Sequence, residues 1–344
     1  MRAMVVRRYG APEVFESKEV ADPQPKAGEV LIRVKAIGIN FADLLQRMGI
    51  YPGTPKPPFI PGLEIAGVVD KVMGGGKPSK DEPLQPGDAV AALTHFNAYA
   101  EWAALPTEQV FRLPPGMPFD DAAAIPVNYL TAYHSIIEMG NLQPADRILI
   151  HGAAGGVGIA AVQLAQARGL VTFGTAGPSK QEFLRKSGVD HAIDYTKNNF
   201  VEVVRKFAPE GIEMVMDPIG GKSWTLSQKC LGPTGRLVVY GFSAAAGPEG
   251  ERSLWRAAKA FLQSPKFPPL ELMRDNLSVI GVHLGRIGSR GGLLRRELEE
   301  LFRMYAAGKI KPVIGKSFPL IDAAAAHRFI HERKNIGKVI LTVK

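Results

Sequence analysis

The alternation of apolar and polar positions divides the 344-residue chain into three parts. Residues 1–123 consist of short apolar runs separated by turn residues, with strand patterns at 29–40, 65–72 and 87–93. Residues 74–88, which are rich in glycine, proline and charge, form a loop between the last two. Short strands punctuated in this way predict a β-rich domain.

From residue 124 to 266, strand patterns alternate with helix patterns. Apolar strand patterns occur at 147–152, 170–177, 191–195, 212–220 and 235–242, and helix patterns at 156–169 and 179–188. This alternation predicts an α/β domain with a doubly wound parallel sheet that carries helices on both faces. After residue 267 the pattern changes again, to a strand at 277–285, helices at 293–310 and 321–335, and a final strand at 337–344.

Residues 244–276 fit neither pattern, and we interpret them as an insertion beside the site. The segment combines an amphipathic helix with a proline-rich turn. Its cations alternate with apolar residues: Arg252, Arg256, Lys259 and Lys266 with Leu254, Trp255, Phe261 and Leu262. One interpretation is a solvated helix that covers the site. The other is a surface for an acyl-CoA, with the acyl chain on the apolar face and the phosphates on the cations.

A glycine-rich turn follows the strand at 147–151. Ala153, Gly155 and Gly158 have the spacing of the three glycines of a dinucleotide-binding fingerprint, with alanine at the first position. The fingerprint joins a strand to a helix whose N-terminus presents N–H groups to a pyrophosphate. We therefore predict a dinucleotide on this turn, with contacts from Ala154, Gly155, Gly156, Val157 and Gly158.

The end of the next strand indicates which dinucleotide is bound. NAD-binding domains place an Asp or Glu there for the ribose 2′-hydroxyl, whereas this chain has Thr175, Ser179 and Lys180. Hydroxyl and ammonium donors suit a 2′-phosphate, so NADPH is favoured and NADH remains possible. The competing interpretation is that Lys180 is only a solvated helix residue.

Composition and charge narrow the class of protein. The length and the 46% hydrophobic content exceed what one core usually organises, which favours two domains. The net charge of +9 is spread along the chain, so a nucleic-acid partner is not indicated. A polyanionic small ligand suits this excess of positive charge equally well. With no apolar run of about 18 residues and no signal-peptide pattern, we expect a cytoplasmic protein without integral membrane association. The single cysteine, Cys230, is predicted to be a core residue.

Motifs along the whole chain resemble one family. They lie at residues 38–52, 58–69, 87–93, 127–136, 153–165, 216–221 and 335–341. As a set they are similar to the zinc-independent medium-chain dehydrogenases/reductases of the quinone oxidoreductase group, nearest to the vesicle amine transport protein-like branch. The resemblance implies a GroES-like catalytic domain from residues 1–123 and 267–344 around a Rossmann domain at 124–266, with the active site in the cleft between them.

The resemblance also implies an activity and its residues. The expected reaction transfers hydride from nicotinamide C4 to an electron-poor C=C bond of an enone, a quinone or an enoyl thioester such as enoyl-CoA. Asn40 and Tyr51 would donate to the developing oxyanion, and Asp43 would hold the loop or the cofactor. Tyr51 has an equal alternative as a packing aromatic, and Leu45 stands where quinone reductases often have tyrosine, which gives a more apolar pocket. Further implied cofactor contacts are Thr131, Tyr195, Gly241, Phe242, Ser243 and Asn335.

A metal is not expected. Where zinc-dependent relatives have ligands, this chain has Asn40, Leu63 with Glu64, and Val127, and neither Leu nor Val can coordinate zinc. Glu64 is then predicted to be a structural buried acid. Two other functions stay open, a zinc-free alcohol dehydrogenase acting on C=O and a scaffold that binds the nucleotide without catalysis.

The last apolar strands of the Rossmann part, at 235–242 and 277–285, predict an exposed sheet edge. Two copies of the chain can cover such edges by pairing around a two-fold axis. We therefore expect a homodimer.

Overall fold

The computed structural model describes residues 1–74, 83–247, 250–287 and 291–344, and it divides into two compact units. The first comprises residues 1–130, 248–252 and 285–344, and the second comprises residues 131–247 and 253–284. Part of the loop expected at 74–88 lies outside the described residues. Residues 267–284, assigned from the sequence to the first domain, belong to the second unit because they contain a strand of its sheet.

The first unit is built on a seven-stranded, mostly antiparallel sheet. Its strands run in the order β14, β15, β3, β4, β5 and β7, with β6 also paired to β3. Their bounds are β3 Glu29–Ile39, β4 Glu64–Val72, β5 Ala89–Leu93, β6 Trp102–Pro106, β7 Val110–Arg112, β14 Ile314–Pro319 and β15 Lys338–Thr342. A separate hairpin pairs β1 (Arg2–Val6) with β2 (Phe15–Glu19). The β-rich part expected from the sequence is thus present, and its last strand comes from the C-terminal end of the chain.

Helices complete the first unit. They are α1 (Phe41–Met48), α2 (Phe119–Ala122), α11 (Gly291–Ala306) and α12 (Ala323–His331), while α3 (Pro126–Tyr133) and α10 (Leu284–Ile287) cross the unit boundaries. Alternating positions are buried along residues 29–36 of β3, as a strand with one face on the core requires, and residues 37–39 at its end are all buried. The α1 helix begins directly after β3, so the end of this strand fixes where α1 starts.

The second unit contains a six-stranded parallel sheet in the order β10, β9, β8, β11, β12 and β13. The strands are β8 Arg147–His151, β9 Val171–Ala176, β10 His191–Asp194, β11 Ile212–Asp217, β12 Leu231–Val239 and β13 Ser278–Gly281. Numbered along the chain this is the 3-2-1-4-5-6 order of a Rossmann sheet, which confirms the predicted fold class. The order reverses between β8 and β11, where such sheets bind ligands at the carboxyl ends of the strands.

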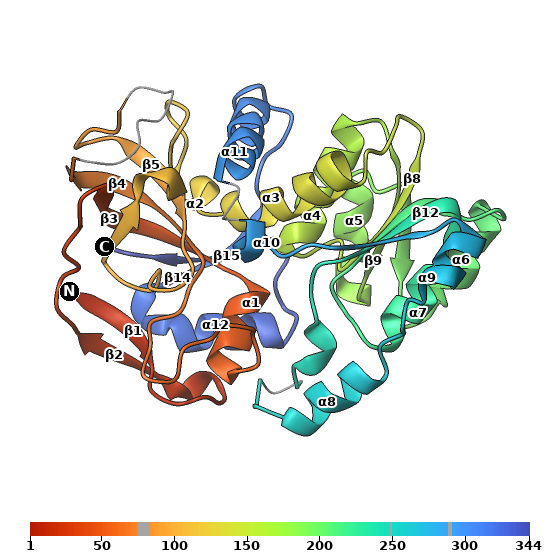
Figure 1. Ribbon diagram of the computed structural model, residues 1–344, viewed down its shortest axis with the longest axis horizontal. Coiled ribbons are helices and arrows are strands. Elements are labelled where there is room, and N and C mark those ends of the chain that lie inside the picture. The colour runs from red at the N-terminus through yellow and green to blue at the C-terminus, as the bar shows by residue number, and fades with distance from the viewer. Residues whose placement is uncertain (75–82, 248–249, 288–290) are drawn as a thin grey trace. The chain divides into compact units, whose positions relative to one another are not determined.

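Helices cover both faces of this sheet (Figure 1). Those on one face are α4 (Gly156–Ala167) and α5 (Gln181–Lys186), and those on the other are α6 (Phe200–Phe207) and α7 (Lys222–Gln228). The core on the second face includes Leu149, Phe173, Val204 and Leu237. Cys230 belongs to this core with no exposed surface, as predicted, and burial raises the pKa of its thiol to about 12.

The 244–276 segment forms α8 (Leu254–Leu262) and α9 (Pro269–Asp275), with a short helical turn at Ser243–Ala245 before them. No helix among the described residues is long and apolar enough to cross a membrane.

Candidate functional site

The turn after β8 has the geometry of a pyrophosphate cradle. Gly152 has the left-handed conformation, with φ +65°. The tight bend therefore lies at Gly152, one residue before Ala153, where the fingerprint spacing predicted it. Gly155 precedes α4 as its N-cap and offers no side chain there, which leaves the first N–H groups of the helix to a ligand. A Cβ on Gly158 would lie 2.2 Å from the Gly152 carbonyl oxygen, so only glycine allows the helix to pack this closely on the turn.

The residues expected at the 2′-phosphate gather at the ends of two adjacent strands. Ala176 ends β9 opposite Asp194, the end of β10, and Tyr195 follows with its side chain 44% exposed. A Cβ on Gly177 would lie 3.8 Å from the Tyr195 hydroxyl, and Lys180 follows half-buried in the next turn. This strand end therefore combines a hydroxyl and a cation, the donors that suit a phosphate.

Thr175 differs from the expectation of direct contact. It is 2% exposed, and its hydroxyl lies 3.0 Å from His151 Nδ1 and 3.4 Å from the Gly152 amide nitrogen. The Thr175 carbonyl oxygen accepts a bond of 3.0 Å from Ala153 N–H. Thr175 thus supports the glycine turn through these backbone contacts, from a buried position.

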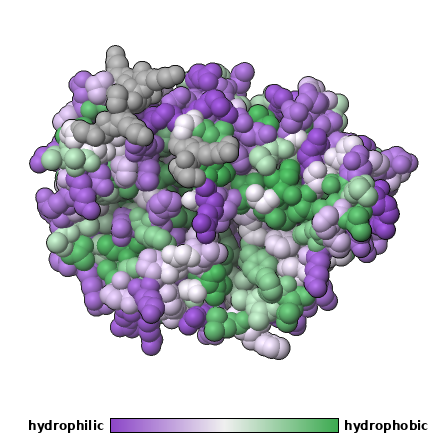
Figure 2. Space-filling model, in the orientation of Figure 1, coloured by the Kyte–Doolittle hydropathy of each residue, from purple (hydrophilic) through white to green (hydrophobic). Residues whose placement is uncertain are grey.

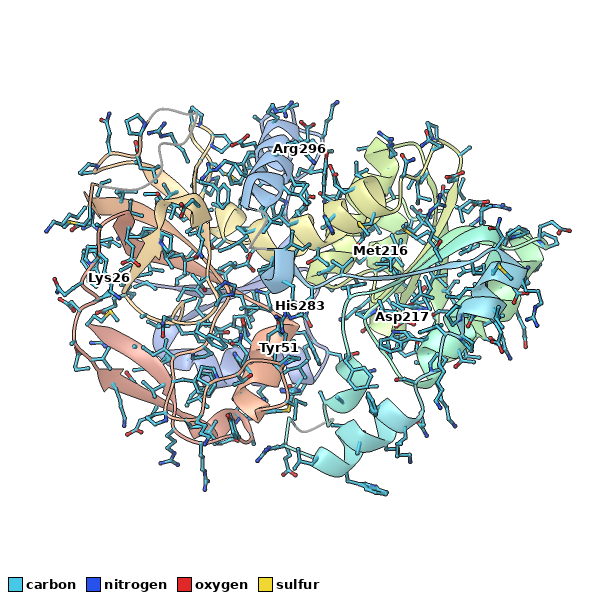
Figure 3. The ribbon with its side chains drawn as sticks, viewed as in Figure 1. Lys26, Tyr51, Met216, Asp217, His283 and Arg296 are labelled. Atoms are coloured by element: carbon cyan, nitrogen blue, oxygen red, sulfur yellow. The ribbon has the colours of Figure 1, made fainter. Side chains whose placement is uncertain are left out.

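A buried polar network supports the same edge of the sheet and was not found from the sequence. Asp217 ends β11 (Figure 3) and accepts bonds from the hydroxyls of Ser223 (2.6 Å) and Ser227 (2.7 Å) and from Ile219 N–H. The Ser227 hydroxyl also lies 3.1 Å from His151 Nε2. Burial lowers the pKa of His151, so the imidazole stays neutral. These bonds tie the ends of β8 and β11 together at the point where strand order reverses.

The other implied cofactor residues lie in three places. Gly241, Phe242 and Ser243 follow β12 and pack on the loop after β11, where Ser243 N–H donates to the Pro218 carbonyl oxygen at 3.0 Å. Thr131 is 7% exposed, and its carbonyl oxygen accepts from Ser135. Asn335 lies in the first unit, where its amide donates to Gly337 O in the loop before β15.

In the first unit, Asn40 and Asp43 meet at the start of α1. Asn40 is the N-cap, and its N–H donates to Asp43 Oδ2 at 2.9 Å. The Asn40 amide group donates to Glu64 Oε1 at 2.7 Å and to Gly38 O at 3.3 Å. Both of its hydrogens are therefore directed at protein acceptors, and a direct bond from Asn40 to a substrate oxygen requires one of them to be released. The predicted donor role of Asn40 stays a prediction.

Tyr51 lies just beyond the C-terminal end of α1 (Figure 3). Its N–H donates to the Leu45 carbonyl oxygen at 3.3 Å, and its carbonyl oxygen accepts from the Thr54 hydroxyl at 2.6 Å. The ring is half-buried. Burial, together with the charge of Asp43, raises the pKa of Tyr51, so its hydroxyl keeps its proton at physiological pH and is able to donate.

Asp43 is fully buried, which makes its ionisation costly. Its Oδ2 accepts from the Tyr99 hydroxyl at 3.2 Å, and that hydroxyl lies 2.9 Å from His327 Nε2. Its Oδ1 has no hydrogen-bond partner in the described part of the chain. Burial raises the pKa of Asp43 to about 7, so this carboxyl group exchanges its proton near neutral pH.

The raised pKa predicts a pH-dependent stability. Folded Asp43 retains its proton up to about pH 7, whereas the unfolded chain loses it near the ordinary value of 3.8, so the folded state loses stability as pH rises between these values. The Asp43→Asn variant keeps an acceptor without the charge. We expect the free energy of unfolding of the wild type to fall relative to this variant by on the order of 4 kcal/mol between pH 4 and 7. Chemical denaturation across that range measures it, and a constant difference would contradict the prediction.

Glu64 is buried, as predicted, and it is paired. Its Oε1 lies 2.5 Å from the ammonium of Lys338, the first residue of β15, and its Oε2 accepts from Val127 N–H at 2.7 Å. Sequence reasoning assigned no role to Lys338. The available signal was a lysine at the head of an otherwise apolar final strand. Among the described residues, no group of three or more His, Cys, Asp or Glu side chains is arranged to hold a metal ion.

Comparisons with known proteins show which family the chain is similar to. Residues 26–115 match the family model of the alcohol dehydrogenase GroES-like domain, and residues 187–341 match that of zinc-binding dehydrogenase. The synaptic vesicle membrane protein VAT-1 homolog of Danio rerio is 39% identical over all of this chain and 70% of its own length. The quinone oxidoreductase of Homo sapiens is 31% identical over 99% of this chain and 97% of its own.

Solved structures are similar over the full length. Escherichia coli quinone oxidoreductase complexed with NADPH has a TM-score of 0.87 at 29% identity, with both chains covered completely. CurK enoyl reductase has a TM-score of 0.82 at 30% identity over all of this chain and 99% of that one.

Proposed function

We propose that this chain, which belongs to the quinone oxidoreductase and VAT-1-like branch of the medium-chain dehydrogenases/reductases, is an NADPH-dependent reductase of activated C=C bonds. The observation that carries the proposal is the glycine turn before α4, where Gly158 leaves room for nothing larger. Support for the activity comes from relatives that are a quinone oxidoreductase and an enoyl reductase.

The cofactor would supply hydride from nicotinamide C4, and the chain supplies binding, orientation and hydrogen-bond donors. The α4 N-terminus with Ala154, Gly155, Gly156 and Val157 would hold the pyrophosphate. Ser179, Lys180 and Tyr195 would hold the 2′-phosphate, and the remaining contacts would come from Thr131, Gly241, Phe242, Ser243 and Asn335. We assign NADPH rather than NADH because no carboxylate stands at the end of β9 to accept from a ribose 2′-hydroxyl.

On the substrate side, the proposal gives Tyr51 the central role. Hydride addition to the β-carbon turns the conjugated carbonyl oxygen into an oxyanion, which a neutral hydroxyl donor stabilises. The half-buried Tyr51 is such a donor. Asn40 and Asp43 would fix the start of α1, and the loop that carries Tyr51 is bonded to the other end of this helix. The experiment is NADPH oxidation with a panel of enones, quinones and enoyl-CoAs. Turnover of at least one class supports the proposal, whereas cofactor binding without any turnover favours the scaffold function.

Within this activity, we propose enoyl thioesters as the substrate class, and the exposed side chains of α8 support this choice. Six cationic or large apolar side chains of this helix are exposed: Leu254, Trp255, Arg256, Lys259, Phe261 and Leu262. The apolar ones are 59–77% exposed, so the helix presents its hydrophobic side outward. Figure 2 shows hydrophobic residues reaching the surface at the lower edge, where α8 lies. A helix that is merely solvated would present its polar side instead.

Within the second unit, α8 packs beside the loop that follows β11, since a Cβ on Gly221 would lie 3.4 Å from the Ala260 carbonyl oxygen. The structure changes one part of the expectation. Arg252 belongs to the first unit, where its guanidinium lies 5.1 Å from the centre of the Tyr9 ring.

Reversing the charge of cationic side chains tests whether enoyl-CoA thioesters are substrates. If phosphates of CoA meet the cations of α8, Arg256→Glu/Lys259→Glu should raise the KM for an enoyl-CoA by roughly tenfold or more per lost contact and leave small enones unchanged. The control is Lys18→Glu/Lys26→Glu, which makes the same charge change on exposed residues elsewhere. Equal effects on both substrate types would contradict the proposal, as would the absence of any turnover of enoyl-CoAs.

A cytoplasmic homodimer is part of the proposal. β13 is an edge strand of the six-stranded sheet, and its middle residues Val279 and Ile280 are only half-buried. Pairing of two such edges would extend the sheet through both copies. Light scattering at micromolar concentration is expected to give about twice the chain mass of 37.1 kDa. A strictly monomeric mass would count against the dimer.

A further inference from the structure

Lys338 holds the Asn40 side chain in a single orientation. The Lys338 side chain is 3% exposed, and its ammonium donates to Asn40 Oδ1 at 2.7 Å as well as to Glu64 Oε1. An ammonium can only donate hydrogen bonds, so it must face the oxygen of the Asn40 amide. The amide nitrogen is thereby turned to Glu64 and Gly38, the two acceptors on its other side.

The cluster packs against Gly38 so closely that no side chain fits at this position. A Cβ on Gly38 would lie 2.6 Å from Glu64 Oε1, 2.7 Å from Lys338 Cε and 2.2 Å from the Ala123 carbonyl oxygen. Gly38 is in β3 with ordinary strand geometry, so close packing and not backbone strain requires glycine at this position. The Glu64 and Lys338 side chains therefore pack directly against the backbone at Gly38, which leads into α1.

A continuous set of bonds leads from Lys338 to Tyr51. Asn40 caps α1 and binds Asp43 through its backbone, which fixes the first turn of the helix. At the other end, Gly49 adopts the left-handed C-cap conformation, and the Leu45 carbonyl oxygen accepts from Tyr51 N–H. The α1 helix has only eight residues, so a shift at its start carries over to its end.

We infer that Lys338 is a positioning residue for the proposed reduction: it locks the Asn40 amide, and α1 carries that orientation to Tyr51. This inference rests on the proposed function. Lys338 and Glu64 act through Asn40 and need no bond to the substrate. A misplacement of about 1 Å at a reacting group can lower turnover by about 100-fold, which is the size of effect expected here.

A pair of variants separates positioning from stability. Lys338→Met leaves the Glu64 charge buried and unpaired, and we expect it to lower the melting temperature. Lys338→Met/Glu64→Gln removes both charges and keeps similar shapes, so we expect the melting temperature to recover. If the pair were only structural, turnover would recover as well. Positioning predicts that kcat stays about 100-fold below the wild type while the dissociation constant for NADPH is unchanged.

A second readout follows the amide itself. In the wild type, both Asn40 side-chain amide hydrogens should exchange slowly in NMR spectra, where Asn40→Ala identifies their signals. In the double variant they should exchange more quickly, because no ammonium then binds the amide oxygen and the amide is held only by Gly38 O and the uncharged side chain at position 64. The matched control is Arg147→Met/Glu213→Gln, which removes another ion pair, of 2.7 Å, at the start of β8. It is expected to leave kcat and the Asn40 signals unchanged.

Two results would overturn the inference: wild-type kcat in the double variant, or Asn40 hydrogens that remain protected in it. Failure of the proposed function gives a different result, because the wild type would then reduce no acceptor in the panel. The amide exchange measurement would in that case decide alone whether Lys338 orients Asn40.

Discussion

Replacing Tyr51 by Phe should lower kcat for enone reduction by about 10²–10³-fold and leave the KM for NADPH unchanged. Removal of one donor to a developing oxyanion typically has an effect of this size. Phenylalanine keeps the ring, so the packing alternative for Tyr51 predicts almost no change in activity. Steady-state kinetics with one enone and one quinone, together with thermal melting to show that the fold is intact, distinguishes the two roles.

The raised pKa of Tyr51 adds a condition to this test. Because the hydroxyl keeps its proton at physiological pH, the activity that depends on it should not fall between pH 7 and 9. A Tyr51→Phe variant with wild-type kcat would show that another group donates to the oxyanion.

The second large effect concerns the cofactor. Lys180→Ala should raise the KM for NADPH by about 10–100-fold and leave that for NADH nearly unchanged, because only NADPH carries the phosphate that the ammonium would bind. Lys186→Ala is the matched control, since this nearby lysine is paired with Glu182 on the surface of α5 at 2.7 Å. Equal changes for both cofactors, or none, would contradict the assignment of Lys180 to the 2′-phosphate.

The sequence pattern predicted most of the second unit because its central strands are largely apolar and alternate with helix patterns. The patterns at 147–152, 170–177 and 212–220 became β8, β9 and β11, and the helix pattern at 156–169 became α4. The domain boundary near residue 267 was misplaced. The strand at 277–285 lies beyond that boundary, although the dimer prediction counted it with the Rossmann strands, and its pairing with β12 places it in the Rossmann sheet.

The candidate site was predicted in part. The glycine turn could be found because its steric demands select glycine at fixed spacing, as the close contact at Gly158 illustrates. The partners of Asn40 could not be found in this way, since Lys338 lies 298 residues further along the chain. Sequence spacing carries no information about such a contact. Likewise, the contact of Thr175 with His151 joins residues 24 positions apart in the sequence.

The buried network at the start of α1 explains why one region of the first unit resists prediction. Tyr99 and His327 come from separate parts of the chain, and each was an ordinary residue in its local pattern. Their positions beside Asp43 follow from the antiparallel sheet and from α12, which packs against the sheet strands β14 and β15. Long-range packing, rather than local sequence, creates this polar cluster.

The most direct test of the central claim follows the hydride. NADPH that carries deuterium at C4 is incubated with the enzyme and an enone, and the product is analysed by mass spectrometry and NMR. We expect deuterium from the transferred face of C4 to appear at the β-carbon of a saturated ketone, while the α-carbon takes its hydrogen from solvent. Deuterium at the carbonyl carbon of an alcohol product, or tight NADPH binding with no transfer to any enone, quinone or enoyl-CoA, would contradict it.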